Sequence, residues 1–380
     1  MGTFRSAVSG YFTALSMTSV VISKTLEPPG RFFGSRRFSD SRLMAQRISY
    51  LRNDALPTVR PGYPGNKLFG NEFANGEELF EPSFATLLKW QLATNPQKEE
   101  KRRDTWVPEV VDCAAAFSST EDMLVWLGHS CFLLRAAGVS LLFDPMLFSS
   151  LGLQHRHPLP CPPEAMRSID YLLLSHGHRD HLDEQSIKLL AAQNPQMQVL
   201  SSLRMAPLLR SMVPGLPVQE AGWWQQYDLG PASPLEITYL PASHWHRRGL
   251  ADMNRVLWGS FMIRVQDRLI YFAGDTSFAE HFEQIEARFG PIDVALMPIG
   301  AYKPAYMMAK SHVNPHEAAK AANVLRAGHV VPMHYGTFAL SDEPASEPLR
   351  QLREVAAGGM LRGELHTPAV GEVLRWTDWE

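Results

Sequence analysis

The stretch Ser175-His176-Gly177-His178-Arg179-Asp180-His181-Leu182-Asp183 decides the fold of this chain. It closes an almost wholly apolar run, 169–175, which is typical of a strand covered on both faces. Four metal-capable side chains follow within six residues: His176, His178, Asp180 and His181. A loop at the end of a buried strand can direct several side chains to one point, whereas a helix would distribute them around its axis. Imidazole and carboxylate donors suit Zn²⁺, Fe or Mn, so a metal site is predicted here.

Three further metal-capable side chains follow other predicted strands. His244 comes just after the alternating run 235–241, Asp275 follows 269–273, and His334 follows 329–333. A lone histidine or aspartate at a strand end is more often structural, but the joint occurrence of three indicates one site. His129 also follows a strand. Two roles are weighed for it, lining the site or packing as a structural histidine, and the structural role is preferred.

The elements around these residues predict a layered α/β fold, with sheets inside and helices outside. Short apolar or alternating runs separated by glycine-containing turns predict strands at 123–127, 131–136, 139–143, 169–175, 235–241, 260–265, 269–273, 292–298 and 329–333. Helical patterns cover 84–92, 183–193, 279–289, 314–325 and 346–357. If the strands form two halves, the region 200–235 joins them.

The composition excludes several classes of protein. The 380 residues are 45% hydrophobic and 20% charged, which fits a globular chain and not a disordered one. The net charge of −3 argues against a nucleic-acid partner. Three cysteines exclude a disulfide scaffold and a four-thiolate zinc site. No uninterrupted apolar run approaches the roughly 18 residues of a spanning helix.

The charge is uneven along the chain. Residues 1–60 hold nine basic and three acidic side chains, a balance of +6, so the remainder carries −3 − 6 = −9. The basic segment is interpreted in three ways: as a removable leader, as a surface that contacts anionic lipid, or as a terminus without a role. We expect residues 1–57 to be poorly ordered, 58–120 to be an extension against the core, and 121–380 to be the main domain. The expected location is the cytoplasm or a membrane surface, with a cleavable leader as an alternative.

The chain resembles the metallo-β-lactamase superfamily, and within it the phospholipases D that hydrolyse N-acylphosphatidylethanolamine. The likeness covers about residues 58–380. It rests on Trp126-Leu127-Gly128-His129-Ser130, Leu142-Phe143-Asp144-Pro145, the histidine loop, Trp223-Trp224, Ser243-His244-Trp245, 254–260, Ala273-Gly274-Asp275-Thr276, 298–302, His312-Val313-Asn314-Pro315 and 334–340.

The resemblance implies a four-layer αββα sandwich that holds two divalent metal ions, Zn²⁺ or alternatively Fe or Mn. In the family's pattern His176, His178 and His244 hold one ion. Asp180, His181 and His334 hold the other, and Asp275 bridges the two. Asp144 matches a position that orients the imidazoles. Two departures from the family, Tyr335 and His246, lie near the ligands and bear on substrate choice.

The resemblance also implies the reaction, which is the hydrolysis of N-acylphosphatidylethanolamine to N-acylethanolamine and phosphatidic acid by a metal-bridging hydroxide. His312 is assigned to the phosphate or to the leaving oxygen, and Asp180 to a second role in proton transfer. Tyr302, His246 and Tyr335 are assigned to substrate contact. The expected partner is a phospholipid, and a homodimer is a further expectation.

Two alternatives are weighed against this function. A hydrolase of a soluble phosphodiester or a lactone would have the same fold. A metal-bound redox or sensing protein is disfavoured because His178 stands where those relatives have glutamate.

Overall fold

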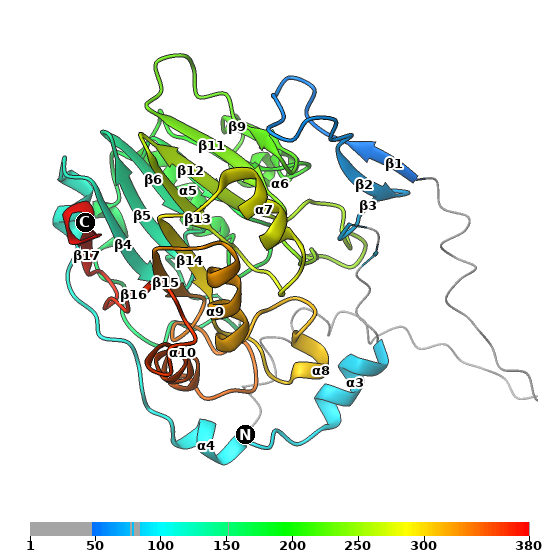
Figure 1. Cartoon of the computed structure of the whole chain (residues 1–380), viewed down its shortest axis with the longest axis vertical. Coiled ribbons are helices and arrows are strands. Elements are labelled where there is room, and N and C mark those ends of the chain that lie inside the picture. Colours follow the sequence, from blue (N-terminus) through cyan, green and yellow to red (C-terminus); the bar gives the residue numbers. More distant parts are fainter. Residues whose placement is uncertain (1–47, 77, 80–83, 151, 380) are drawn as a thin grey trace, which may run out of the picture.

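The structure is a computed structural model that describes residues 48–76, 78–79, 84–150 and 152–379 (Figure 1). Two seven-stranded sheets form the interior, and helices cover their outer faces. This is the four-layer αββα arrangement that the family resemblance implied, and it agrees with the layered α/β fold predicted from the sequence pattern. The segment 1–47, which holds most of the basic N-terminal residues, lies outside the described residues.

The first sheet carries the histidine loop. Its strands are, in spatial order, β17 (Val373–Arg375), β4 (Met123–Gly128), β5 (Cys131–Ala136), β6 (Val139–Phe143), β7 (Tyr171–Leu174), β8 (Gln198–Ser202) and β9 (Val218–Ala221). Neighbours from β17 to β6 are antiparallel, and neighbours from β6 to β9 are parallel. Parallel neighbours need crossover connections. Helices α5 (Glu184–Gln193) and α6 (Ala206–Met212) provide two of them.

The second sheet repeats this pattern. Its order is β10 (Gln225–Gln226), β11 (Leu235–Leu240), β12 (Ser260–Val265), β13 (Arg268–Phe272), β14 (Val294–Pro298), β15 (His329–Met333) and β16 (Glu364–Leu365). Neighbours are antiparallel as far as β13 and parallel from there to β16. The connections between the parallel strands contain α7 (His281–Phe289), α8 (Ala305–Met308), α9 (Pro315–Val324) and α10 (Glu347–Ala357).

Aromatic side chains fill the space between the two sheets. The ring of Phe143 in β6 stacks on Phe272 in β13 at 4.8 Å, and Phe261 in β12 lies 6.3 Å from Phe143. The adjacent residue Leu142 belongs instead to the cluster under α5 and α6. Successive side chains on a strand point to opposite faces. A strand between two apolar layers therefore needs apolar residues throughout, which explains the unbroken apolar runs of the sequence.

The N-terminal extension contributes a small sheet and two helices. The sheet holds β1 (Ile48–Leu51), β2 (Asn66–Phe69) and β3 (Glu72–Phe73), and the helices are α3 (Phe84–Leu92) and α4 (Lys98–Arg103). Short 3₁₀ turns occur at 114–118, 163–165 and 376–379.

Residues 48–57 correct the expected start of the extension. The sequence analysis grouped them with a poorly ordered terminus, but 48–51 form a strand. In addition, Asn53 donates to the Glu220 carbonyl at 2.8 Å, and the Pro57 carbonyl accepts from Gln226 N at 3.0 Å. The segment is ordered by contacts with residues that are distant in the sequence, and its own polar residues give no local signal of those contacts. The division into three segments otherwise stays a prediction.

Several elements were not predicted. Strands β10, β16 and β17 have two or three residues, too few for a periodic pattern. Strand β9 lies at a sheet edge and is mostly half-buried, so it has no apolar run. The sheets change between Ala221 and Gln225, inside the region 200–235 where a junction was expected. Among the described residues, no helix is both long enough and apolar enough to span a bilayer.

Candidate metal centre

The histidine loop is held at both of its ends. Strand β7 precedes it, and the Asp183 side chain accepts from Ser186 N at 2.8 Å to cap α5. Within the loop the His178 carbonyl accepts from His181 N at 3.2 Å and from Leu182 N at 3.0 Å. This turn brings side chains that are close in sequence to one side of the chain.

A first group of imidazoles consists of His176, His178 and His244. The Nδ1 atom of His178 lies 2.9 Å from His176 Nε2 and 3.0 Å from His244 Nε2. His244 follows β11, and its Nδ1 lies 2.9 Å from the Ser311 carbonyl. That hydrogen bond leaves Nε2 directed at the group, which is how metal-binding imidazoles are usually oriented.

A second group consists of Asp180, His181 and His334, together with His129. The Asp180 Oδ2 atom lies 3.4 Å from His129 Nε2, 3.5 Å from His334 Nε2 and 3.6 Å from His181 Nε2. His334 has the left-handed φ of +61°, and its backbone N–H donates to the His129 carbonyl at 3.0 Å. The ends of β4 and β15 are thereby joined beside the histidine loop.

Asp275 lies between the two groups. Its Oδ2 atom is 3.1 Å from His334 Nε2 and 3.2 Å from His181 Nε2 on one side. On the other side it is 3.9 Å from His244 Nε2 and 4.0 Å from His176 Nε2. A Cβ at the preceding Gly274 would lie 2.7 Å from the Gly259 carbonyl oxygen, so only glycine fits before this carboxylate.

Asp144 supports the loop from behind. Its carboxylate accepts from Ser175 N at 2.8 Å and from Ser175 Oγ at 2.5 Å, and lies 2.8 Å from His181 Nδ1. Ser175 Oγ in turn lies 3.0 Å from His176 Nδ1. One carboxylate at the end of β6 therefore contacts an imidazole of the second group directly and one of the first group through Ser175.

The donor set fits metal ions. Five buried atoms make no well-aligned hydrogen bond among the described residues, although the four ring nitrogens lie 3.1–3.9 Å from carboxylate oxygens: His129 Nε2, His181 Nε2, His312 Nδ1, His334 Nε2 and Asp275 Oδ1. A buried polar atom without a partner is costly, and cations bound here would satisfy these atoms. Nitrogen and oxygen donors without thiolate suit Zn²⁺, Fe or Mn.

The electrostatics of the group also require positive charge. Burial by itself would raise the pKa of Asp275, but His181 and His334 hold it well below its usual value. Burial opposes protonation of His334, yet the carboxylates of Asp275 and Asp180 raise its pKa to about 9. Burial lowers the pKa of His244 to about 4. Two buried carboxylates thus need cations beside them, as protons on imidazoles or as metal.

Two histidines border the seven predicted ligands. His312 Nδ1 lies 3.9 Å from Asp275 Oδ2, and its side chain is 13% exposed. The side chains of His129, His176, His181, His244 and His334 are at most 2% exposed. His312 is therefore the ring most accessible to substrate. His129 was assigned a structural role, but it contacts Asp180 directly. His129 follows β4 in the same way that His244, Asp275 and His334 follow their strands. This shared position in the sequence could have identified His129 as a residue of the site.

The three predicted substrate contacts have mainly internal partners. Tyr335 stacks on Trp126 at 4.9 Å and on Trp106 at 6.3 Å. The Tyr302 hydroxyl donates to Glu347. The ring of His246 lies parallel to that of His178 at 6.0 Å, and its backbone N–H donates to Asn254 Oδ1 at 3.2 Å. Substrate contact by these residues stays a prediction.

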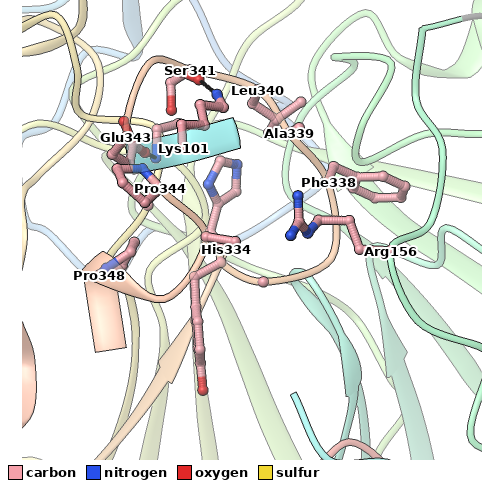
Figure 2. Close-up of a pocket in the computed structure, with 15 residues that line it drawn as sticks. Lys101, Arg156, His334, Phe338, Ala339, Leu340, Ser341, Glu343, Pro344 and Pro348 are labelled. Atoms are coloured by element: carbon pink, nitrogen blue, oxygen red, sulfur yellow. Dashed lines mark hydrogen bonds between the residues drawn. The ribbon is translucent and has the colours of Figure 1, made fainter. Parts of the chain in front are cut away.

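The N-terminal extension helps to form a pocket beside His334 (Figure 2). Lys101 from α4 and Arg156 from a loop of the first sheet bring positive charge to it, and Phe338 and Leu340 bring apolar surface. Lys101 donates to the Ser341 carbonyl, and Arg156 donates to the Trp106 carbonyl at 3.2 Å. The extension is therefore part of the surroundings of the site.

With this geometry established, the chain was compared with known proteins. Residues 140–335 match the family model of the β-lactamase superfamily domain. This chain belongs to the metallo-β-lactamase superfamily. It is a metal-dependent hydrolase, as the sequence predicted.

Curated relatives carry related descriptions. The chain is 29% identical to N-acyl-phosphatidylethanolamine-hydrolyzing phospholipase D 1 of Caenorhabditis elegans, over 79% of this chain and 92% of that protein. It is 30% identical to the mitochondrial enzyme of that name from Saccharomyces cerevisiae, over 65% of this chain and 54% of that protein. A metal-dependent hydrolase from Pyrobaculum calidifontis is 29% identical over 66% of this chain and 98% of its own length.

Solved structures show the same fold. The metallo hydrolase Igni18 from Ignicoccus hospitalis superposes with a TM-score of 0.52 at 22% identity, covering 66% of this chain and 97% of its own. An isothiocyanate hydrolase from Delia radicum gut bacteria gives a TM-score of 0.54 at 20% identity, covering 67% and 99%. These likenesses concern the fold alone.

Proposed function

We propose that this superfamily member hydrolyses N-acylphosphatidylethanolamine to N-acylethanolamine and phosphatidic acid. The observation that carries the proposal is the position of Asp275 Oδ2 between two groups of metal-capable side chains. The phospholipid substrate is suggested by the two similar proteins that are named for this reaction.

The seven predicted ligands would hold two divalent ions, most simply Zn²⁺. His176, His178 and His244 would hold one ion, Asp180, His181 and His334 would hold the other, and Asp275 would contribute to both. When bound, two such ions activate water at neutral pH and neutralise the charge of a phosphodiester. The chain's contribution is to fix these donors, and Asp144 does so for His181 and, through Ser175, for His176.

His312 is the residue that we place against the substrate. Burial lowers its pKa to about 3, so near neutral pH its ring is an uncharged imidazole. Its Nδ1 lies near Asp275 on the more exposed side of the site. In hydrolysis the bond from phosphorus to the N-acylethanolamine oxygen breaks, and that oxygen gains a proton. As an uncharged imidazole, His312 donates an N–H hydrogen bond to the phosphate or to the leaving oxygen, and the proton that this oxygen gains comes from the attacking water. Asp180 adds a carboxylate that can accept a proton from water.

The test joins metal analysis to two release assays. We expect the purified chain to contain divalent metal and to release N-acylethanolamine from N-acylphosphatidylethanolamine in mixed micelles. Asp275→Ala should lose this activity, whereas the change of an exposed carboxylate on α10, Glu354→Ala, should leave it intact.

A soluble phosphodiester, bis(p-nitrophenyl) phosphate, separates the substrate from the chemistry. Turnover of this compound without release from the lipid would overturn the lipid assignment in favour of a soluble phosphodiester. A metal-free chain with full activity would overturn the metal-dependent mechanism.

A further inference from the structure

A second cluster of metal-capable side chains lies at the opposite end of β15 from His334. His329 begins β15, Glu364 begins β16, and His366 directly follows β16. One ligand atom from each of the three lies within 4.8 Å of the others. This cluster shares no residue with the candidate metal centre described above.

The backbone pairing brings these three side chains together. His329 and Glu364 are register partners in the parallel pair β15–β16. His366 is two residues beyond Glu364, and its N–H extends the ladder by donating to the Val330 carbonyl at 2.9 Å. Residues two apart on an extended strand share a face. The sheet edge therefore presents two imidazoles and a carboxylate on one side.

The distances suit a tetrahedral metal ion. His329 Nδ1 and His366 Nε2 are 2.9 Å apart, and Glu364 oxygens lie 3.8 Å and 4.0 Å from these nitrogens. Zinc–ligand bonds of about 2.0–2.1 Å in tetrahedral geometry place ligand atoms about 3.3 Å from one another. The Glu364 side chain is 68% exposed, so it can rotate to bring one oxygen about 0.5–1 Å closer to the rings, while the two ring nitrogens separate by about 0.4 Å.

An aromatic cover protects the cluster from solvent. The ring of Trp379 lies 5.8 Å from that of His329, with an interplanar angle of 23°, and 5.9 Å from that of His366. The side chains of His329 and His366 are only 19% and 15% exposed as a result. Partial exclusion of water strengthens the binding of a cation by these donors.

We propose that His329, Glu364 and His366 bind a transition-metal ion of the Zn²⁺–Cu²⁺ class at the edge of the second sheet. The two-imidazole, one-carboxylate donor set suits these ions. The bound ion links the two-residue strand β16 to β15 and stabilises the C-terminal part of the fold. This site goes beyond the proposed hydrolytic function and does not depend on it.

The first test counts bound zinc. The full chain, His329→Ala and His366→Ala are dialysed against buffered Zn²⁺, and zinc per chain is measured by atomic absorption. Each variant is expected to hold one zinc ion fewer than the unsubstituted chain. His316→Ala removes an exposed imidazole from α9 and should keep the full count. Equal zinc contents in all four chains would overturn the proposal and leave the two rings as a hydrogen-bonded pair.

Glu364→Gln guards against a folding defect, because it changes an exposed side chain and keeps its shape. It should weaken zinc binding at this site by about tenfold or more while circular dichroism stays unchanged. Unaltered affinity in this variant would contradict a role for the carboxylate.

Trp379 offers a local optical measurement. Cu²⁺ should quench part of the tryptophan emission of the unsubstituted chain and of His316→Ala. The same part should be absent from Trp379→Phe and insensitive to Cu²⁺ in His366→Ala. Identical quenching in all of these chains would place the copper elsewhere and refute the proposal.

The Asp275→Ala background separates this site from the active site. Asp275→Ala is expected to lose hydrolysis, but its zinc content should still exceed that of Asp275→Ala/His366→Ala by one ion. His366→Ala alone should retain hydrolysis. Failure of the lipid assay would thus leave the zinc difference standing, and failure of the zinc difference would leave the lipid assay standing.

Discussion

Asp144 shows how one side chain can set the geometry of a whole site. It has a left-handed φ of +36° at the end of β6 and is fully buried. Its two oxygens have three partners, which are the Ser175 N–H, the Ser175 hydroxyl and His181 Nδ1. Because both oxygens are used as acceptors, a neutral amide cannot replace the carboxylate without losing a partner.

Asp144→Asn should therefore reduce metal affinity by about 10- to 100-fold, the usual effect of removing a partner that orients a ligand. The affinity can be measured by competition with a chromophoric chelator. Asp170→Asn is the matched control, since that carboxylate accepts from Ser140 N at 2.8 Å just before the start of β7, away from the loop. Equal losses in both variants would show a general folding effect instead.

Metal uptake should release protons. The carboxylates of Asp275 and Asp180 outweigh burial and raise the pKa of His334 to about 9 and that of His181 well above its usual value. Both rings are thus protonated at pH 7 in the metal-free chain, and a metal ion must displace those protons. Affinity should rise as the pH increases towards 9.

Calorimetric titration of the metal-free chain with Zn²⁺ in buffers of different ionisation enthalpy measures this release. We expect a slope that corresponds to about two protons per chain from these rings. A binding enthalpy independent of the buffer would contradict the predicted protonation.

At the scale of elements, α10 joins three segments around one buried carboxylate. Glu347, 2% exposed, accepts from Tyr302 after β14, from Lys303 beside it, and from Gln97 in the N-terminal extension at 2.6 Å. The residues just before α10 carry Ser346, whose N–H donates to Asp104 at 2.8 Å. The N-terminal extension and the loop after His334 therefore both bond to the N-terminal end of α10.

Removing this carboxylate should destabilise the fold. Glu347→Ala removes the carboxylate that Tyr302, Lys303 and Gln97 share, although Lys303 keeps its bond to Gln97 and Gln97 its bond to Glu100. We expect a loss of roughly 2–4 kcal/mol in the free energy of unfolding. Glu354→Ala on the same helix breaks an exposed pair with Arg350 and should cost at most about 0.5 kcal/mol. Urea unfolding of both variants measures the difference, and similar midpoints would contradict the role given to Glu347.

At the scale of the whole molecule, both sheets contribute to one site. The first sheet supplies His129, Asp144 and the histidine loop, and the second supplies His244, Asp275 and His334. The site needs the two sheets to face each other, which the aromatic layer between them ensures. The distribution of charge is a second property at this scale. Residues 1–60 carry a net charge of +6, whereas the remainder of the chain carries −9.

That charge distribution predicts salt-sensitive binding to anionic vesicles. Each lysine or arginine near such a surface contributes about 1 kcal/mol, and salt screens this attraction. The full chain should sediment with vesicles of phosphatidylcholine and phosphatidylserine at about 50 mM salt and dissociate at about 500 mM. Vesicles of phosphatidylcholine alone are the control, and equal binding to both would exclude attraction through the basic segment.

Much of the candidate site was predictable because its signals are local. A buried parallel strand needs apolar residues on both faces, so its end is visible in the sequence, and metal-capable side chains that follow such ends are easily found. His176, His178, Asp180, His181, His244, Asp275 and His334 were all identified in this way, and the structure brings them together. Their division into two groups came from the family resemblance.

Other features depend on pairing between distant segments, and only the tertiary structure decided them. The contact of His129 with Asp180 requires β4 and β7 to lie in one sheet. The cluster of His329, Glu364 and His366 exists because β16 pairs with β15, and two residues of strand carry no periodic signal. Residue type and local pattern thus determined which side chains could bind metal. Hydrogen-bond register across the sheets determined which of them meet.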